Sequence, residues 1–437
     1  MTTYDKDMVA YVRNQMVGES PAPTSEVGLV GWMRKNLFSS IPNTLLTLVG
    51  IYLAYLAIST FSHFAITSAV WSGESGADCR PPASSDGACW PFVGAYFEQF
   101  IYGRYTISER WRVNLVYLVL AIGIAWLVYE RAPKRALVAG LMLTAFPIFS
   151  LIMLTGGNFD FSSSFIWTCI ILAALIMIAS IAVPILTKTD PIPTVKSAAI
   201  VLALLALVLF ICSVDFGMQE VETSIWGGLL VTLVIAITGI VISLPFGVIL
   251  ALGRQSDMPI IRIISIIFIE FWRGVPLITV LFMASVMLPL FMPKGIHVDN
   301  LLRAMIGVAF FASAYMAEVV RGGLQALPKG QYEGAQAMGL GYWQMMQLII
   351  LPQALKLVIP AIVSTFIGLF KDTTLVSIVG LFDLLGQIQS SFSDPKWISP
   401  FTSHTGYLFA AIIFWIFCFS MSRYSVYMER KLDTGHR

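Results

Sequence analysis

Charge is scarce in this sequence. Charged residues make up 12% of the 437 positions, whereas soluble domains commonly carry about a quarter. Hydrophobic residues account for 57%, and the mean hydropathy is +0.80. The 27 basic residues nearly balance the 25 acidic ones, so the chain lacks the basic surplus typical of nucleic-acid binding. This composition excludes an ordinary soluble enzyme and a disordered chain, and it indicates an all-α polytopic membrane protein.

Motifs for redox, metal and nucleotide chemistry are also missing. The five cysteines form no CxxC pair, and the four histidines are scattered without an HExxH motif, so we expect no metal site. The chain contains no Gly-Lys dipeptide and therefore no Walker A phosphate loop. We accordingly expect it to bind no cofactor and to hydrolyse no ATP. A membrane-embedded enzyme would need a clustered nucleophile and base, and the sequence shows no such cluster.

Long apolar runs predict about ten membrane spans, because a spanning helix needs ~20 mostly apolar residues. The first 40 residues are polar, so no cleavable signal peptide is evident and the first apolar run is expected to remain as an anchor. The expected spans cover roughly 45–67, 114–130, 136–153, 165–186, 196–214, 222–252, 262–290, 302–322, 353–379 and 405–427.

The distribution of lysine and arginine predicts the orientation. Most of these residues fall in connections on one side of the expected membrane, together with both chain ends, which places both termini in the cytoplasm. The long polar loop 68–113 then lies outside, where disulfides persist. We expect a disulfide between Cys79 and Cys89 in this loop, with two unpaired thiols as the alternative. The other three cysteines lie in apolar runs and are expected to be packing residues.

The two halves of the chain differ in intramembrane charge. Spans in 45–215 are almost free of charge, whereas later spans contain ionisable residues, which commonly mark a partner, a cavity or a functional site. Glu270 and Arg273 lie three residues apart on one helical face, before a helix-loosening Gly274-Val275-Pro276. They either form an ion pair that fixes packing or belong to a pathway or interface.

Further charges lie in the eighth and ninth spans. Glu318 either pairs with Arg321 at i,i+3 or holds a cation in a water-filled cavity. Lys371 and Asp372 are adjacent and cannot share a helical face, so each needs a separate partner. An inter-helix structural network and a substrate or gating role both remain open for this pair.

The segment 327–352 has the most distinctive pattern. It is expected in the cytoplasm, bracketed by Pro328 and Pro352, with helix-favouring residues 331–338, a break at 339–341 and a second amphipathic stretch at 342–351. Two short helices and a sharp turn suit docking into another protein's cleft. The alternative is a surface helix that lies on lipid headgroups.

This segment resembles the coupling signature of permeases in binding-protein-dependent ATP-binding-cassette (ABC) importers. That signature reads Glu-Ala-Ala, three residues, Gly, nine residues, Ile-x-Leu-Pro. Gly334 replaces its middle alanine, a change that lowers helix propensity by ~1 kcal/mol. The resemblance assigns ATPase coupling to this set: Glu333, Gly334, Ala335, Gly339, Gly341, Leu351 and Pro352, with Ile349 also at its expected place.

Neighbouring stretches narrow the family. Residues 270–277, 315–331 and 370–380 resemble the polar amino-acid permeases of the histidine, glutamine, arginine and glutamate group. The extra N-terminal spans and both chain ends resemble the M-type subunit of bacterial general L-amino-acid transporters. The resulting domain prediction is a cytoplasmic segment 1–44, accessory helices 45–215 with the outer loop 68–113, a permease core 216–430 and a cytoplasmic tail 431–437.

The resemblance implies a type I importer permease that moves L-amino acids of broad range across the bacterial inner membrane. Its implied partners are a related Q-type permease in a heterodimer, an ABC ATPase dimer that binds ATP and Mg, and a periplasmic amino-acid-binding protein that acts on outer loops such as 381–404. Residues expected along the substrate pathway are Glu270, Arg273, Ser313, Tyr315, Glu318, Lys371, Asp372 and Thr373.

Among these, Glu318 is the expected site for the substrate ammonium. The substrate carboxylate is assigned to Lys371, Thr373 or backbone N–H groups near Gly274. The main alternative function is an ion-coupled secondary amino-acid transporter, in which Glu270, Glu318 and Asp372 would act as relay residues. That alternative leaves the cytoplasmic coupling segment unexplained.

Overall fold

The computed structural model describes residues 28–80, 86–159, 163–186, 191–292 and 298–432. Most of the expected N-terminal segment 1–44 and of the tail 431–437 therefore lies outside the described residues. The described parts consist of helices and loops with isolated β-bridges. This arrangement agrees with the all-α class expected from the composition.

Nine described helices are long and apolar enough to cross a membrane, and a bent pair raises the count to ten if that pair is one span. The expectation of about ten spans is therefore confirmed. The nine are α2 (Ile41–Ser62, continued by a π-turn to Thr67), α4 (Arg110–Val128), α5 (Arg135–Thr155), α6 (Ser163–Leu186), α7 (Pro191–Ser213), α8 (Gly228–Arg254), α12 (Asn300–Ala326), α16 (Ile359–Asp372, continued by a 3₁₀ turn to Val379) and α18 (Thr402–Leu432).

The expected seventh span, 262–290, is not a single straight helix. Helix α9 (Pro259–Gly274) and the run from α10 (Leu277–Phe282) to α11 (Leu288–Phe291) meet at 104°. Val275 is extended, with φ −111° and ψ 132°, and Pro276 starts the next helix without an N–H to donate. The sequence located this break correctly, but the bend is far larger than the local loosening that we expected.

Helices α8 and α12 form the centre of the C-terminal helices, and glycine allows their close approach. A Cβ placed on Gly247 of α8 would lie 2.8 Å from the Cβ of Met316 on α12. One on Gly239 would lie 3.3 Å from Val308 Cγ1 on α12 and 2.9 Å from Leu369 Cδ2 on α16. Small residues serve this purpose in membranes because close packing there replaces the hydrophobic driving force. Gly247 is therefore required by the packing of α8 against α12, because a Cβ there would also approach the backbone of Ala317.

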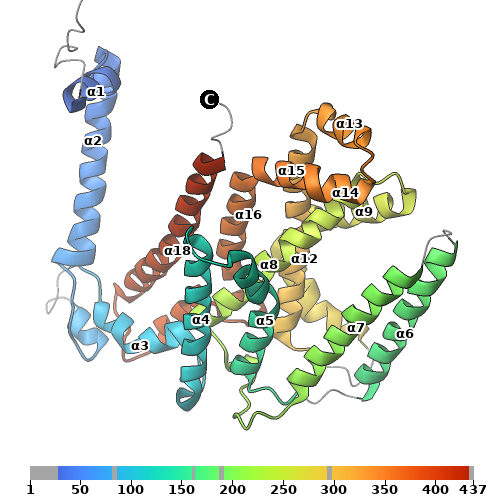
Figure 1. Ribbon diagram of the computed structural model, residues 1–437. Helices are drawn as coiled ribbons and strands as arrows, with labels where there is room; N and C mark the ends of the chain where they lie inside the picture. The colour runs from blue at the N-terminus through green and yellow to red at the C-terminus, as the bar shows by residue number, and fades with distance from the viewer. Residues whose placement is uncertain (1–27, 81–85, 160–162, 187–190, 293–297, 433–437) are drawn as a thin grey trace, which may run out of the picture.

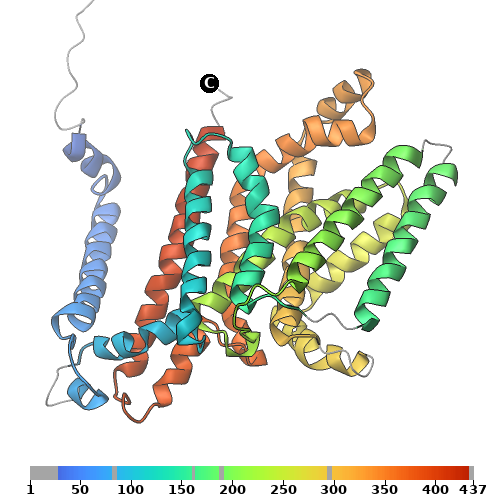
Figure 2. The same cartoon turned by 60° about the horizontal axis from the view of Figure 1, so that its bottom comes forward.

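The N-terminal helices surround this core unevenly. Helices α4 and α5 form one antiparallel pair and α6 and α7 another, whereas α2 stands apart and has no buried residue (Figure 1). The short helices α1 (Gly28–Asn36), α13 (Lys329–Ala337), α14 (Tyr342–Met345) and α15 (Leu351–Leu357) lie towards the face that holds the end of α18. Figure 2 shows α3 (Trp90–Tyr102) towards the opposite face, next to α17 (Leu384–Ser390). The fold thus has one face with the segment 327–352 and an opposite face with the long loop 68–113.

Candidate functional site

The segment 327–352 forms a helical hairpin that projects from the bundle (Figure 1). Helix α13 ends where Gly339 adopts a φ of +75°, a left-handed conformation that favours glycine. The N–H groups of Gly339 and Leu340 donate to the carbonyls of Gln336 and Ala335, at 2.9 and 3.3 Å. These bonds close the end of α13 in the manner of a helix-terminating motif. The break that the sequence predicts at 339–341 is therefore present.

One side of the hairpin is fixed to α12. Ala335 is 2% exposed and packs in a cluster with Leu324 and Ile350. The hydroxyl of Tyr332 donates to the carbonyl of Leu324 at 3.2 Å. Motion of α13 would therefore be transmitted directly to α12, a helix of the permease core.

The amphipathic stretch 342–351 leads to Pro352, and the chain stays helical beyond it. A π-turn at Met346–Ile350 leads directly into α15, and Pro352 occupies its first turn. A proline is tolerated there because the first N–H groups of a helix have no partner within that helix. The hairpin consequently continues through α15 to the start of α16.

The other side of the hairpin faces outwards. Glu333 is exposed and has no ion pair among the described residues, and a Cβ on Gly334 would meet open space. Met338, Trp343 and Leu348 are 80%, 65% and 69% exposed. A gathering of large apolar side chains on a projecting element is typical of a protein-docking surface.

A cluster of five charged side chains connects α8, α9 and α12. The carboxylate of Glu318 accepts hydrogen bonds from Arg254 at 2.8 Å and Arg321 at 2.7 Å, and Arg273 lies 3.6 Å away. Arg254 also donates to Glu270 at 2.9 Å. The Glu318 side chain is only 16% exposed, so its charge is compensated inside the protein. With three arginines and two glutamates, the cluster has a net positive charge.

The structure gives both glutamates ion-pair partners, and their place on a substrate pathway stays a prediction. Glu318 does pair with Arg321 at i,i+3, whereas Glu270 pairs with Arg254 instead of with Arg273. Because Glu318 already faces three guanidinium groups, it is not available to a substrate ammonium in this conformation. The sequence analysis did not single out Arg254. No local signal marks it, because only packing brings the end of α8 against α9 and α12.

Of the other expected pathway residues, the structure brings Tyr315 beside this cluster, whereas Ser313 and Thr373 bond to their own helices. Ser313 and Thr373 are buried, and their hydroxyls donate to the carbonyls of Ala309 and Phe370 at 2.6 and 2.8 Å. Tyr315 is 40% exposed, and its ring lies 5.7 Å from the guanidinium of Arg273.

Lys371 and Asp372 are the last two residues of α16, at the end of the helix away from the segment 327–352. They have no ion pair with any described residue. The partners that we expected for them are therefore absent from the described part of the chain, and their role stays a prediction.

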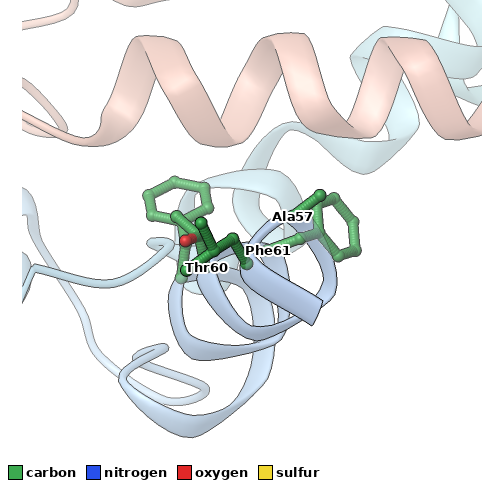
Figure 3. A pocket seen from close by; sticks show the side chains of 5 residues that line it. Ala57, Thr60 and Phe61 are labelled. Carbon is green, nitrogen blue, oxygen red and sulfur yellow. The ribbon is translucent and has the colours of Figure 1, made fainter. Parts of the chain in front are cut away.

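A hollow of about 560 Å³ lies on the isolated helix α2, far from this chemistry (Figure 3). Leu56, Ala57, Phe61 and Phe64 line it with Thr60, which supplies its single polar side chain. An apolar surface of this kind offers no charge to a zwitterionic amino acid. Within the described ranges, no three His, Cys, Asp or Glu residues form a group that could hold a metal ion.

The loop 68–113 contains the expected disulfide between Cys79 and Cys89. Nearby, the side chain of Asp383 caps α17 and accepts from the N–H groups of Leu385 and Gly386. Burial raises the pKa of this carboxyl to about 6. The face that holds this loop therefore has its own covalent and polar framework, separate from the charged cluster.

Comparison with known proteins identifies the family. Residues 243–434 match the family model of the binding-protein-dependent transport system inner membrane component. The inner membrane amino-acid ABC transporter permease protein YhdY of Escherichia coli K12 is 46% identical over 95% of this chain and 96% of its own length. The glutamate/glutamine/aspartate/asparagine transport system permease protein BztC of Rhodobacter capsulatus is 42% identical over 98% of this chain and 99% of its own.

A shorter relative shows how much of the chain is additional. The probable glutamine ABC transporter permease protein GlnP of Bacillus subtilis is 33% identical to this chain. The match spans 47% of this chain and 91% of GlnP. The N-terminal helices thus precede a family core in the C-terminal half, and members of this family work with separate ATPase subunits and a binding protein. This chain belongs to the multi-pass inner-membrane permease subunits of binding-protein-dependent amino-acid ABC importers, which have no ATPase activity of their own.

Proposed function

We propose that this chain is the M-type half of a heterodimeric permease that imports several L-amino acids, including glutamate, glutamine, aspartate and asparagine. Near full-length similarity to BztC, whose name states these four substrates, supports this range. The other half would be a related Q-type permease. In this arrangement both chain termini and the segment 327–352 lie in the cytoplasm.

The projecting hairpin is the observation that carries this proposal. Its inner side packs on α12 through Ala335, and its outer side presents unpaired Glu333 together with exposed apolar residues. We infer that the hairpin docks in a cleft of an ATPase subunit, which binds ATP and Mg. Closure of the ATPase dimer would then move α13, and with it α12. Transport is driven by the different affinities of the partners for inward- and outward-facing states.

The charged cluster belongs to the proposed substrate path near its cytoplasmic end. Arg254 is the last residue of α8, and Glu318 lies in the second half of α12, two turns before its end. The cluster joins three core helices through one carboxylate, so relative motion of these helices requires its ion pairs to rearrange. Its net positive charge favours passage of the substrate carboxylate rather than retention of the ammonium.

A reconstituted complex tests the coupling role. The full permease, with its partner permease and ATPase, is placed in proteoliposomes, and ATPase activity is measured with and without amino-acid-loaded binding protein. Glu333→Arg is expected to abolish the stimulation and to weaken co-purification of the ATPase. Glu429→Arg is the matched control, because it makes the same charge change at an exposed position on the same face and should retain stimulation.

Two results would contradict the proposal. Wild-type stimulation in Glu333→Arg would remove the coupling assignment. Amino-acid uptake by this chain without any ATPase would replace the importer with the ion-coupled secondary transporter.

A further inference from the structure

Two segments that are far apart in the sequence form one unit on the outer face. The N–H of Gly76 donates to the carbonyl of Lys396 at 2.8 Å, and Arg80 Nη2 donates to the carbonyl of Ile398 at 2.6 Å. The N–H of Cys89 donates to the hydroxyl of Thr405 at 2.8 Å. The accessory loop thus contacts directly the connection that leads into α18. We call residues 74–80 and 394–400 together the outer platform.

The outer platform is rigidly supported. The disulfide partners Cys79 and Cys89 are completely buried, in an apolar cluster that includes Phe92 and Trp397. A Cβ on Gly76 would lie 2.7 Å from the carbonyl carbon of Trp397, so the two segments are in direct backbone contact. Cross-linking lowers the entropy of the unfolded loop and so favours one folded arrangement. A surface that is already ordered loses little conformational entropy when a partner binds.

The platform has a hollow of about 640 Å³, lined by Arg80, Ile398, Ser399 and Pro400. Ile398 is 48% exposed, and Lys396 is exposed with its ammonium 5.9 Å from the Trp397 ring centre. The hollow therefore combines a guanidinium with apolar lining, next to a second cation. This chemistry suits a carboxylate flanked by apolar side chains on a partner protein.

We propose that the outer platform is a docking surface for one lobe of the amino-acid-binding protein. This inference rests on the function proposed above. The platform lies on the face opposite the coupling hairpin, as Figures 1 and 2 show, and therefore on the side from which the substrate arrives. Residues 74–80 lie outside the matched family region 243–434, so the accessory loop contributes to partner recognition beyond the shared permease core.

Helix contacts connect the outer platform to the central helices. Helix α3, which follows the disulfide loop, contacts α8, α17 and α18. Helix α18 also packs along α16, the helix that continues from the coupling hairpin. A binding protein on the platform would thus act on α3 and α18, and through α16 on the hairpin that we propose docks on the ATPase.

Charge reversal in the complete reconstituted complex tests the proposal. The binding-protein concentration for half-maximal ATPase stimulation is measured for wild type, Arg80→Glu and Lys396→Glu. Each reversal is expected to raise this concentration about tenfold or more, because it places like charges opposite each other. The effect should diminish as salt is raised, because exposed charges are screened. Arg104→Glu, on the same loop but outside the platform, is the matched control and should behave as wild type.

A photo-crosslinker at Ile398 provides an independent measurement that does not depend on altered charge. We expect a covalent product with the substrate-loaded binding protein, and competition by excess unlabelled binding protein. The proposal is overturned if both reversals leave the half-maximal concentration unchanged, if Arg104→Glu raises it equally, or if Ile398 crosslinks to the partner permease. Failure of the binding protein to stimulate the wild-type complex would instead overturn the proposed function itself.

Discussion

At the scale of single residues, Glu318 is the most connected charge in the permease core. Its carboxylate faces Arg254, Arg273 and Arg321, which come from three different helices. Glu318→Gln would leave these guanidinium groups without their shared counter-charge, so we expect a loss of about 2 kcal/mol in stability, typical of hydrogen bonds to charged groups. Thermal unfolding of the purified complex measures this loss.

A double-mutant cycle separates the ion pair from other effects of the substitution. Glu318→Gln combined with Arg321→Gln should cost less than the two single losses together, because the pair is already broken by either one. Glu429→Gln is the matched control on an exposed glutamate and should have little effect. Strict additivity of the two losses would show that the cluster does not act as a unit.

At the scale of elements, the α8–α12 contact depends on the absence of a side chain at Gly247. A methyl group there would meet Met316 Cβ at 2.8 Å and the backbone nitrogen of Ala317 at 3.0 Å. We therefore expect Gly247→Ala to destabilise the protein by about 1–3 kcal/mol, as overpacked cores do. Thermal unfolding in detergent, with the amount of monodisperse protein as a second readout, measures the effect.

Gly50 on α2 provides the matched comparison for this prediction. It is also within a long apolar helix, but a Cβ there meets nothing within 4 Å. Gly50→Ala should be neutral or stabilising by up to ~1 kcal/mol, because alanine favours the helix. Equal effects of the two substitutions would mean that helix propensity, rather than contact between helices, determines the outcome.

At the scale of the whole molecule, the proposed orientation places the coupling hairpin and the outer platform on opposite sides of the membrane. Cysteine introduced at Met338 or Glu429 should react with a membrane-impermeant maleimide only after cell lysis. Cysteine at Arg104 should react in intact spheroplasts. All three positions are exposed, so differences in labelling report sidedness rather than burial. Labelling of Met338→Cys in intact spheroplasts would contradict the orientation.

Local patterns were sufficient for much of this protein. Apolar runs of membrane-spanning length predicted about ten spans, because the bilayer requires each crossing segment to satisfy its own backbone hydrogen bonds. The glycines at 339 and 341 predicted the turn of this hairpin, and Gly339 adopts the left-handed conformation that the turn needs. The Gly274-Val275-Pro276 sequence likewise marked the break after α9, since proline cannot continue a regular helix.

Contacts between distant residues were decided only by the tertiary structure. Nothing near Arg254 predicts that it meets Glu270 and Glu318, because this meeting depends on how α8, α9 and α12 pack. Likewise, the sequence placed Ser313 and Thr373 along a pathway, whereas packing buries both and binds their hydroxyls to the backbone. The sequence by itself determined the spans, the turn between α13 and α14, and the family. The packing of segments separated by hundreds of residues determined the charged cluster and the outer platform, since such contacts leave no periodic pattern along the chain.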